Sequence, residues 1–144
     1  MRFFIAGIMQ GSHADTELHG QDYRDELKSL LREHFPSADI YDPFSDHQQS
    51  VAYDDLQGRE VFRYHNRLCR EVDVIVAFAP QASMGTAIEM WEGHQNGTVV
   101  LTISPMTHNW VIRFCSHGIF PDLPAFQAAL QAGDILRLIQ EHQT

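Results

Sequence analysis

Short apolar runs alternate along the chain with longer segments in which apolar residues recur at helical spacing. From Val74 to Phe78 no polar side chain interrupts the run, a pattern typical of strands buried on both faces of a parallel sheet. Strands are expected at 2–6, 39–41, 72–78 and 98–103, and helices at 22–34, 53–71, 84–96, 110–114 and in two pieces after Asp122. This alternation predicts a single α/β domain, residues 1–144, built as a flavodoxin- or Rossmann-like three-layer sandwich around a parallel sheet of about five strands.

The loops after residues 6, 41, 78 and 103 are rich in glycine and polar residues. Loops that follow parallel strands meet at one edge of the sheet, where open α/β folds bind ligands. We therefore expect one crevice that contains Gly7, Gln10, Asp42, Phe44, Ser83, Gly85, Glu89, Ser104, His108 and Asn109.

The helix start after the third strand is the most informative segment. Ser83 is a suitable N-cap, and Glu89 follows in the second turn. Gly85 and Gly93 flank Glu89 on the same helix face, so we expect open space around the carboxylate, at a cost of about 1 kcal/mol of helix stability per glycine. The alternative is an ordinary solvated helix carboxylate. The opposite face is expected to pack on the sheet and consists of Met84, Ile88 and Trp91.

The composition limits the partners of the chain. The formal net charge is −9, so we expect no nucleic-acid polymer as a partner, whereas a small nucleotide can bind at a helix N-terminus. Cys69 and Cys115 are the only cysteines and are expected to be buried free thiols, which favours the reducing cytoplasm. The sequence has no signal-peptide pattern and no apolar run of membrane-spanning length, so no membrane partner is expected.

Nine histidines are scattered along the chain. No two of them have helical i, i+4 spacing with a third ligand at a usual distance, and neither an HExxH motif nor a Cys/His knuckle occurs. We therefore expect surface histidines rather than a metal site, and no motif implies an organic cofactor.

Four segments resemble those of the nucleoside 2-deoxyribosyltransferase superfamily, which includes transferases and 2'-deoxynucleoside 5'-phosphate N-hydrolases. They are the strand ending in Ala6-Gly7, the strand 73–77, the helix start Gly85-x-x-x-Glu89 and the segment Asn109-Trp110-Val111. The resemblance implies cleavage of the N-glycosidic bond of a small nucleoside or nucleotide, with Glu89 as the nucleophile. Because the reference pKa of Glu is about 4.3, we expect this carboxylate to be ionised at neutral pH.

The chain departs from the family pattern in two directions. Ser83 stands where the hydrolases carry a phosphate-binding Ser and the transferases an Asp, whereas Ile8 and Gln10 replace the Ser and Arg of the hydrolases' first loop. Asn109 matches an Asn that the transferases receive from a neighbouring subunit. Transfer to a base and hydrolysis therefore both stay open. The resemblance implies substrate-binding roles for Gly7, Gln10, Phe44, Ser83 and Gly85.

Several residues allow two interpretations. His65 stands where the family has an active-site Asp, and it is either a catalytic acid or base near neutral pH or plain helix surface. Phe44 and Phe4 are either walls of a base pocket or core residues, and the loop position favours the pocket for Phe44 while the strand position favours the core for Phe4.

The segment after Asn109 also has two interpretations. Its apolar residues either form a homodimer interface that completes the site with Asn109 of a neighbouring subunit, or they are the core side of their own helix. The residues concerned are Trp110, Val111, Ile112 and Phe114.

Two rival functions remain at this point. A non-catalytic nucleotide-binding module of the same fold would account for the departures at Ile8, Gln10 and His65. A flavodoxin-like regulatory domain would require an acidic cluster after the first strand, and residues 6–12 contain none. An assay for free base separates an enzyme from a binding module.

Overall fold

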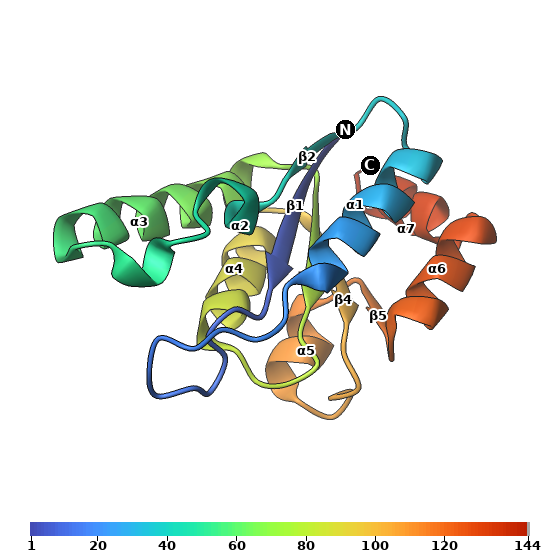
Figure 1. Cartoon of the computed structure of the whole chain (residues 1–144). Helices are drawn as coiled ribbons and strands as arrows, with labels where there is room; N and C mark the ends of the chain where they lie inside the picture. The colour runs from blue at the N-terminus through green and yellow to red at the C-terminus, as the bar shows by residue number, and fades with distance from the viewer. Residues whose placement is uncertain (144) are drawn as a thin grey trace.

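The computed structural model describes residues 1–143 and consists of a five-stranded parallel sheet with helices on both faces (Figure 1). The strands are β1 (Arg2–Gly7), β2 (Asp39–Tyr41), β3 (Val74–Phe78), β4 (Val99–Ile103) and β5 (Gly118–Phe120). Their order is β2-β1-β3-β4-β5, which is flavodoxin-like and places the topological switch point between β1 and β3. The predicted α/β class and parallel sheet are therefore confirmed.

Helices cover the two faces of the sheet in two groups of three (Figure 1). One group is α1 (Asp22–His34), α6 (Leu123–Gln131) and α7 (Asp134–His142), and the other is α3 (Asp55–Glu71), α4 (Met84–Gln95) and α5 (Trp110–Cys115). The short α2 (Pro43–Asp46) and a 3-10 turn, Ser50–Ala52, occupy a segment that we expected to be a loop. Among residues 1–143, no helix is both long and apolar enough to cross a membrane.

The sequence pattern did not locate β5. This strand has only three residues, all of them partly exposed, and it pairs with β4 alone at the edge of the sheet. So short a segment carries no readable alternation of apolar and polar positions.

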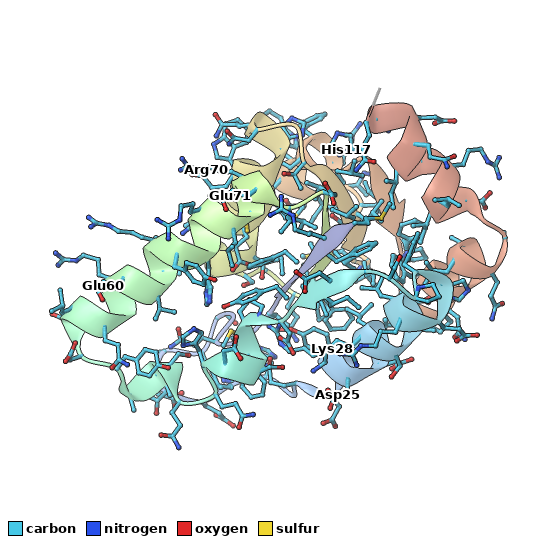
Figure 2. The ribbon with its side chains drawn as sticks, turned by 90° about the horizontal axis from the view of Figure 1, so that it is seen from above. Asp25, Lys28, Glu60, Arg70, Glu71 and His117 are labelled. Atoms are coloured by element: carbon cyan, nitrogen blue, oxygen red, sulfur yellow. The ribbon has the colours of Figure 1, made fainter. Side chains whose placement is uncertain are left out.

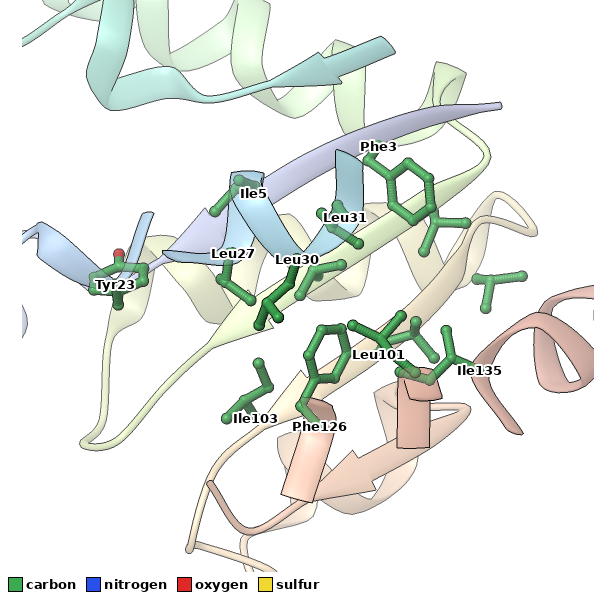
Figure 3. Packing of buried hydrophobic residues seen from close by; sticks show 14 of the residues in the cluster. Phe3, Ile5, Tyr23, Leu27, Leu30, Leu31, Leu101, Ile103, Phe126 and Ile135 are labelled. Carbon is green, nitrogen blue, oxygen red and sulfur yellow. The ribbon is translucent and has the colours of Figure 1, made fainter. Parts of the chain in front are cut away.

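The core beneath α1, α6 and α7 is closely packed, as Figure 3 shows. Phe3 and Ile5 of β1, Leu27 of α1 and Phe126 of α6 all belong to this cluster and are fully buried. Each such side chain contributes roughly 1.5–3 kcal/mol of stability relative to an exposed position.

The second core cluster lies beneath α3, α4 and α5 and contains Phe4, which is fully buried and stacks on Tyr41 with ring centroids 5.6 Å apart. The core interpretation of Phe4 is therefore confirmed. Cys69 and Cys115 belong to the same cluster and are free thiols, as expected.

Helix α4 packs on the sheet with a face other than the one we expected. Met90 and Gly93 are buried, and a Cβ on Gly93 would overlap Cδ1 of Ile75. This glycine lets α4 approach β3 closely, so the expectation of open space at Gly93 was wrong, whereas a Cβ on Gly85 would meet nothing within 4 Å. The apolar residues expected on the sheet are instead exposed: Met84, Ile88 and Trp91.

Candidate active site

Glu89 lies in the second turn of α4, beyond the carboxyl end of β3 and beside β1. The helix begins as predicted, because Oγ of the N-cap Ser83 accepts hydrogen bonds from Thr86 N at 3.4 Å and from Thr86 Oγ1 at 3.0 Å. The strand order reverses between β1 and β3. Helix α4 therefore holds the carboxyl group at the edge position where folds of this type bind ligands.

The environment of Glu89 differs from the sequence expectation. Burial raises the pKa of Glu89 to about 8, and the positive charge of Arg24 opposes part of this rise. Desolvation therefore shifts the carboxyl group of Glu89 toward its protonated form near neutral pH, against the expectation of an ordinary ionised carboxylate. The residue still keeps part of its surface exposed. A carboxyl group that is desolvated but accessible is typical of catalytic acids and nucleophiles.

Arg24 organises the sheet edge around Glu89, and the sequence analysis did not single it out. The residue is only 2% exposed. Its guanidinium donates hydrogen bonds to the carbonyl oxygens of Gly7 at 3.0 Å and Ile5 at 3.3 Å, and it pairs with Asp42 at 2.9 Å. These bonds join α1 to the carboxyl ends of β1 and β2. Arg24 therefore fixes the geometry of the edge and supplies a buried positive charge beside Glu89.

Asp42 is the anionic centre of this arrangement. Burial opposes its ionisation, but Arg24, Ser45 and Lys28 together hold the pKa of Asp42 below its usual value. Lys28 Nζ lies 3.1 Å from Asp42 and 2.8 Å from Asp25, on the outer part of α1 (Figure 2). Because the carboxylate of Asp42 is already bound by two cations, it is a structural group rather than a candidate nucleophile.

Gly7 ends β1 at a position that allows no side chain. A Cβ there would overlap the hydroxyl of Tyr23, which donates a hydrogen bond to the carbonyl oxygen of Ile8 at 3.0 Å. Burial raises the pKa of Tyr23, so its hydroxyl stays protonated. Gly7 thus serves the packing of α1 against the sheet edge.

A cavity of about 240 Å³, the histidine cavity, lies between α2, α3 and the loop after β1, which is called the first loop (residues 8–20). It is lined in part by Gln10, His47, Tyr53 and His65. His65 Nε2 is 3.2 Å from the hydroxyl of Tyr41, and His47 Nδ1 is 2.9 Å from that of Tyr53. Burial, with the nearby charges of His47 and Arg24, lowers the pKa of His65 to about 4. His65 is therefore neutral at pH 7 and suited to hydrogen bonding.

A second cavity of about 400 Å³, the methionine cavity, lies between the first loop and the N-terminal ends of α4 and α5. Met84, Met90 and Met106 contribute apolar surface, and Ser83 and Asn109 contribute polar groups. Oδ1 of Asn109 caps α5, since it accepts hydrogen bonds from the backbone N–H groups of residues 111 and 112 at 3.0 and 3.3 Å.

The candidate residues thus fall into three places at one edge of the sheet. Gln10 and His65 share the histidine cavity, Ser83 and Asn109 share the methionine cavity, and Glu89 lines neither of them. The first loop borders both cavities. Phe44 lines neither cavity, and its ring centroid lies 5.9 Å from the guanidinium carbon of Arg24, so the structure does not support the base-pocket interpretation of Phe44.

An exposed apolar surface extends over α3, α4 and α5. Trp110 is 76% exposed while Ile112 is buried, so the core interpretation holds for Ile112 and is wrong for Trp110 and Phe114. The surface consists of Leu56, Phe62, Tyr64, Met84, Ile88, Trp91, Trp110, Val111 and Phe114.

No protein-family model matches the sequence, and no curated protein matches it. Among solved structures, the fold is similar to that of a 2-deoxyribosyltransferase from Bacillus psychrosaccharolyticus, a biocatalyst for nucleoside synthesis. The TM-score is 0.66 at 17% identity, with 90% of this chain and 96% of that chain covered.

Two further structures share the fold. One is the CMP N-glycosidase BcmB of Clostridium botulinum, with a TM-score of 0.53 at 15% identity over 92% of this chain and 99% of that one. The other is a conserved protein from Enterococcus faecalis V583, with a TM-score of 0.50 at 17% identity over 98% of each chain. The chain therefore has the fold of nucleoside 2-deoxyribosyltransferases and their relatives, and the resemblance drawn from the sequence is confirmed at the level of the fold.

Proposed function

We propose that this protein cleaves the N-glycosidic bond of a small nucleoside or nucleotide, with Glu89 as the nucleophile. The observation that carries the proposal is a single desolvated carboxyl group at the switch point of the sheet, beside the buried guanidinium of Arg24. The structural likeness to a 2-deoxyribosyltransferase and a CMP N-glycosidase supports the same class of reaction.

The proposed reaction has two displacement steps. In the first, a carboxylate oxygen of Glu89 bonds to the anomeric carbon, the C–N bond breaks, and the base leaves with the bonding electrons and takes up one proton. Glu89 reacts as the carboxylate, and the proton that the departing base takes up comes from a water molecule, which is left as hydroxide. In the second, water or another base bonds to the anomeric carbon, gives a proton to that hydroxide and releases the carboxylate. Desolvation leaves Glu89 available to stabilise positive charge on the sugar.

The histidine cavity is the proposed site of the base. Its hydrogen-bonding groups include two imidazoles, a side-chain amide and a phenol, which belong to His47 and His65, Gln10 and Tyr53. Ser83 and the open backbone at Gly85 are placed to bind the sugar or its 5' substituent.

We further propose a homodimer in which the exposed apolar surface of α4 and α5 is the interface. A partner would cover Trp110, Val111 and Phe114 and bring its Asn109 to the neighbouring site. The location in the cytoplasm stays a prediction, based on two free thiols.

The test is an incubation of the protein with ribo- and deoxyribonucleosides and their monophosphates, followed by chromatography for free base. A 2-fluoro nucleoside, which slows formation of the oxocarbenium ion, should in addition leave an adduct on Glu89 that is visible by intact mass and peptide mapping. Release of base with a mapped adduct supports the proposal. Binding of a nucleotide without release of any base would favour the non-catalytic module instead.

A further inference from the structure

The first loop, residues 8–20, gathers metal-ligand side chains that their spacing in the sequence did not reveal. His13, Asp15 and Glu17 each offer one ligand atom, and these atoms lie within 4.8 Å of one another. His13 Nδ1 is 3.7 Å from Glu17 Oε2. Ligand atoms around a tetrahedral ion with bonds of about 2.1 Å are roughly 3.4 Å apart. Small rotations of two exposed carboxylates are therefore enough to close this set around an ion.

The imidazole of His13 has a ring nitrogen without a hydrogen-bond partner among residues 1–143. Its Nδ1 is covered from solvent and makes no hydrogen bond to any residue of the described chain, since the contact with Glu17 is too long. The ring of His19 packs beside that of His13, with centroids 4.3 Å apart, and its Nε2 is also covered and without a hydrogen bond within residues 1–143. A covered polar atom without a partner destabilises the fold. A metal bond would remove this cost at His13.

The backbone of the loop holds the cluster in place. His13 N donates to Gln10 O at 3.0 Å, and His19 N donates to Met9 O at 2.7 Å. Gly11 has a φ of 57°, and a Cβ there would lie 2.6 Å from His19 Nε2. Glycine adopts such a backbone conformation without strain, because it has no Cβ. The loop is thus shaped so that His19 supports the ring of His13.

We propose that His13, Asp15 and Glu17 bind a divalent transition-metal ion, for which Zn²⁺ is the best match, with His19 as the support of the His13 ring. An imidazole combined with carboxylates suits Zn²⁺, whereas Mg²⁺ and Ca²⁺ prefer oxygen ligands alone. Gly11 and Ser12 belong to the same loop and line the methionine cavity. An ion bound in this loop would therefore hold in place the wall that the loop contributes to that cavity. This inference does not depend on the proposed reaction.

The test is isothermal titration of the metal-free full-length protein with ZnCl₂. We expect saturable binding of one ion per chain, no comparable heat with MgCl₂, and a loss of affinity of at least about tenfold in each of Asp15→Asn, Glu17→Gln and His13→Ala. Circular dichroism should show that the variants stay folded, because both carboxylates are exposed. In the Co²⁺-loaded protein, visible absorption bands should appear and should change in His13→Ala.

His142→Ala is the matched control. His142 lies at the end of α7, where its ring is 4.6 Å from that of His117. Its replacement therefore tests whether Zn²⁺ binds at these two histidines instead of in the first loop. This variant should bind Zn²⁺ as the wild type does. The proposal is overturned by an absence of saturable Zn²⁺ binding, by unchanged affinity in the loop variants, or by a loss of binding in His142→Ala.

Discussion

The two faces of the sheet are built differently. Beneath α1, α6 and α7 the large apolar side chains are nearly all enclosed, and Leu136 is the one large apolar residue of these three helices that is exposed. On the other face, α3, α4 and α5 leave nine such residues at the surface. The α4–sheet contact instead uses Gly93 and Met90, so the helix lies close to the sheet and its bulky residues point away.

This difference separates stability from proposed function. The α1 side anchors the fold, and its polar groups at the sheet edge, those of Arg24, Tyr23 and Lys28, bind the backbone or Asp42. The α4 side carries Glu89, the boundaries of both cavities and the exposed apolar surface. Mutations on the first face should therefore act on unfolding, and mutations on the second face on chemistry and assembly.

The largest effect is expected from Glu89→Gln. This change keeps the size of the side chain but removes the nucleophile, so base release should fall by at least about a thousandfold while the fold is retained. Rates of base release by chromatography, with circular dichroism as a check on folding, measure this effect.

The matched control is Glu92→Gln, three residues further along the same helix. Glu92 pairs with Arg70 of α3 at 2.7 Å, near the position labelled in Figure 2, and an exposed pair of this kind contributes about 0–1 kcal/mol. Its rate should stay within about twofold of wild type. Equal losses in both variants would contradict the role of Glu89.

The next effect compares the two faces directly. Leu27→Ala removes a fully buried side chain beneath α1 and should lower the free energy of unfolding by about 2–5 kcal/mol. Met84→Ala removes one that is 80% exposed on α4 and should change this free energy by about 0.5 kcal/mol or less. Urea denaturation of both variants, at protein concentrations below those of the proposed dimer, measures the two changes in the free energy of unfolding. Similar losses would mean that the α4 face is part of the monomer core.

A third effect concerns pH. Because burial raises the pKa of Glu89 to about 8, the fraction of free protein with an ionised nucleophile falls about tenfold for each pH unit below 7. We expect kcat/KM for base release to follow this fraction, so a profile that is flat from pH 5 to pH 8 would show that Glu89 is ionised throughout.

The same raised pKa affects stability with a defined sign. Between the ordinary pKa of Glu and about 8, folded Glu89 keeps a proton that the unfolded chain has lost, so this residue destabilises the fold increasingly as pH rises through that window. Glu89→Gln should therefore be more stable than wild type at pH 8.5, by a few kcal/mol at most, and the two should converge near pH 4.5. Thermal melts across this range measure the difference.

A smaller effect is expected for assembly. Trp110→Ser removes a 76% exposed aromatic side chain from the proposed interface and should raise the dimer dissociation constant at least about tenfold. Leu136→Ser, at 42% exposure on α7, is the control on the other face and should leave the constant unchanged. Sedimentation velocity across a concentration series distinguishes them. A wild-type protein that is monomeric at tens of micromolar would contradict the homodimer.

Sequence patterning predicted the parts of the molecule that depend on local periodicity. The buried run 74–78, the N-cap Ser83 and the two helical pieces after Asp122 all lie where they were expected, since each follows from nearest neighbours along the chain. Placement of the polar loops at one sheet edge followed from the parallel topology. The roles of Glu89, His65 and Asn109 in a reaction stay predictions.

The features that the sequence did not reveal depend on distant contacts. Arg24 pairs with Asp42, 18 positions away, so only the tertiary fold shows that it is buried. The packing face of α4 was misassigned because Gly93 packs by its lack of a side chain, which a hydrophobicity pattern counts as neutral. The only local signal for Arg24 was a charge next to Tyr23 on an apolar helix face.

The smallest effect concerns the 5' substituent of the substrate, at the α4 side of the edge. Ser83 and the backbone of Gly85 offer neutral donors, while the guanidinium of Arg24 is already bound by Asp42 and by backbone carbonyl oxygens. We therefore expect kcat/KM for a nucleoside 5'-monophosphate and for its nucleoside to differ by less than about tenfold.

Ser83→Gly costs the helix cap only a few tenths of a kcal/mol, so it should remove whatever preference exists without unfolding the protein. A preference above about 100-fold, near 2.7 kcal/mol, would require a cation that leaves its present partners when the phosphate binds, and it would make hydrolysis of monophosphates the better description of the activity.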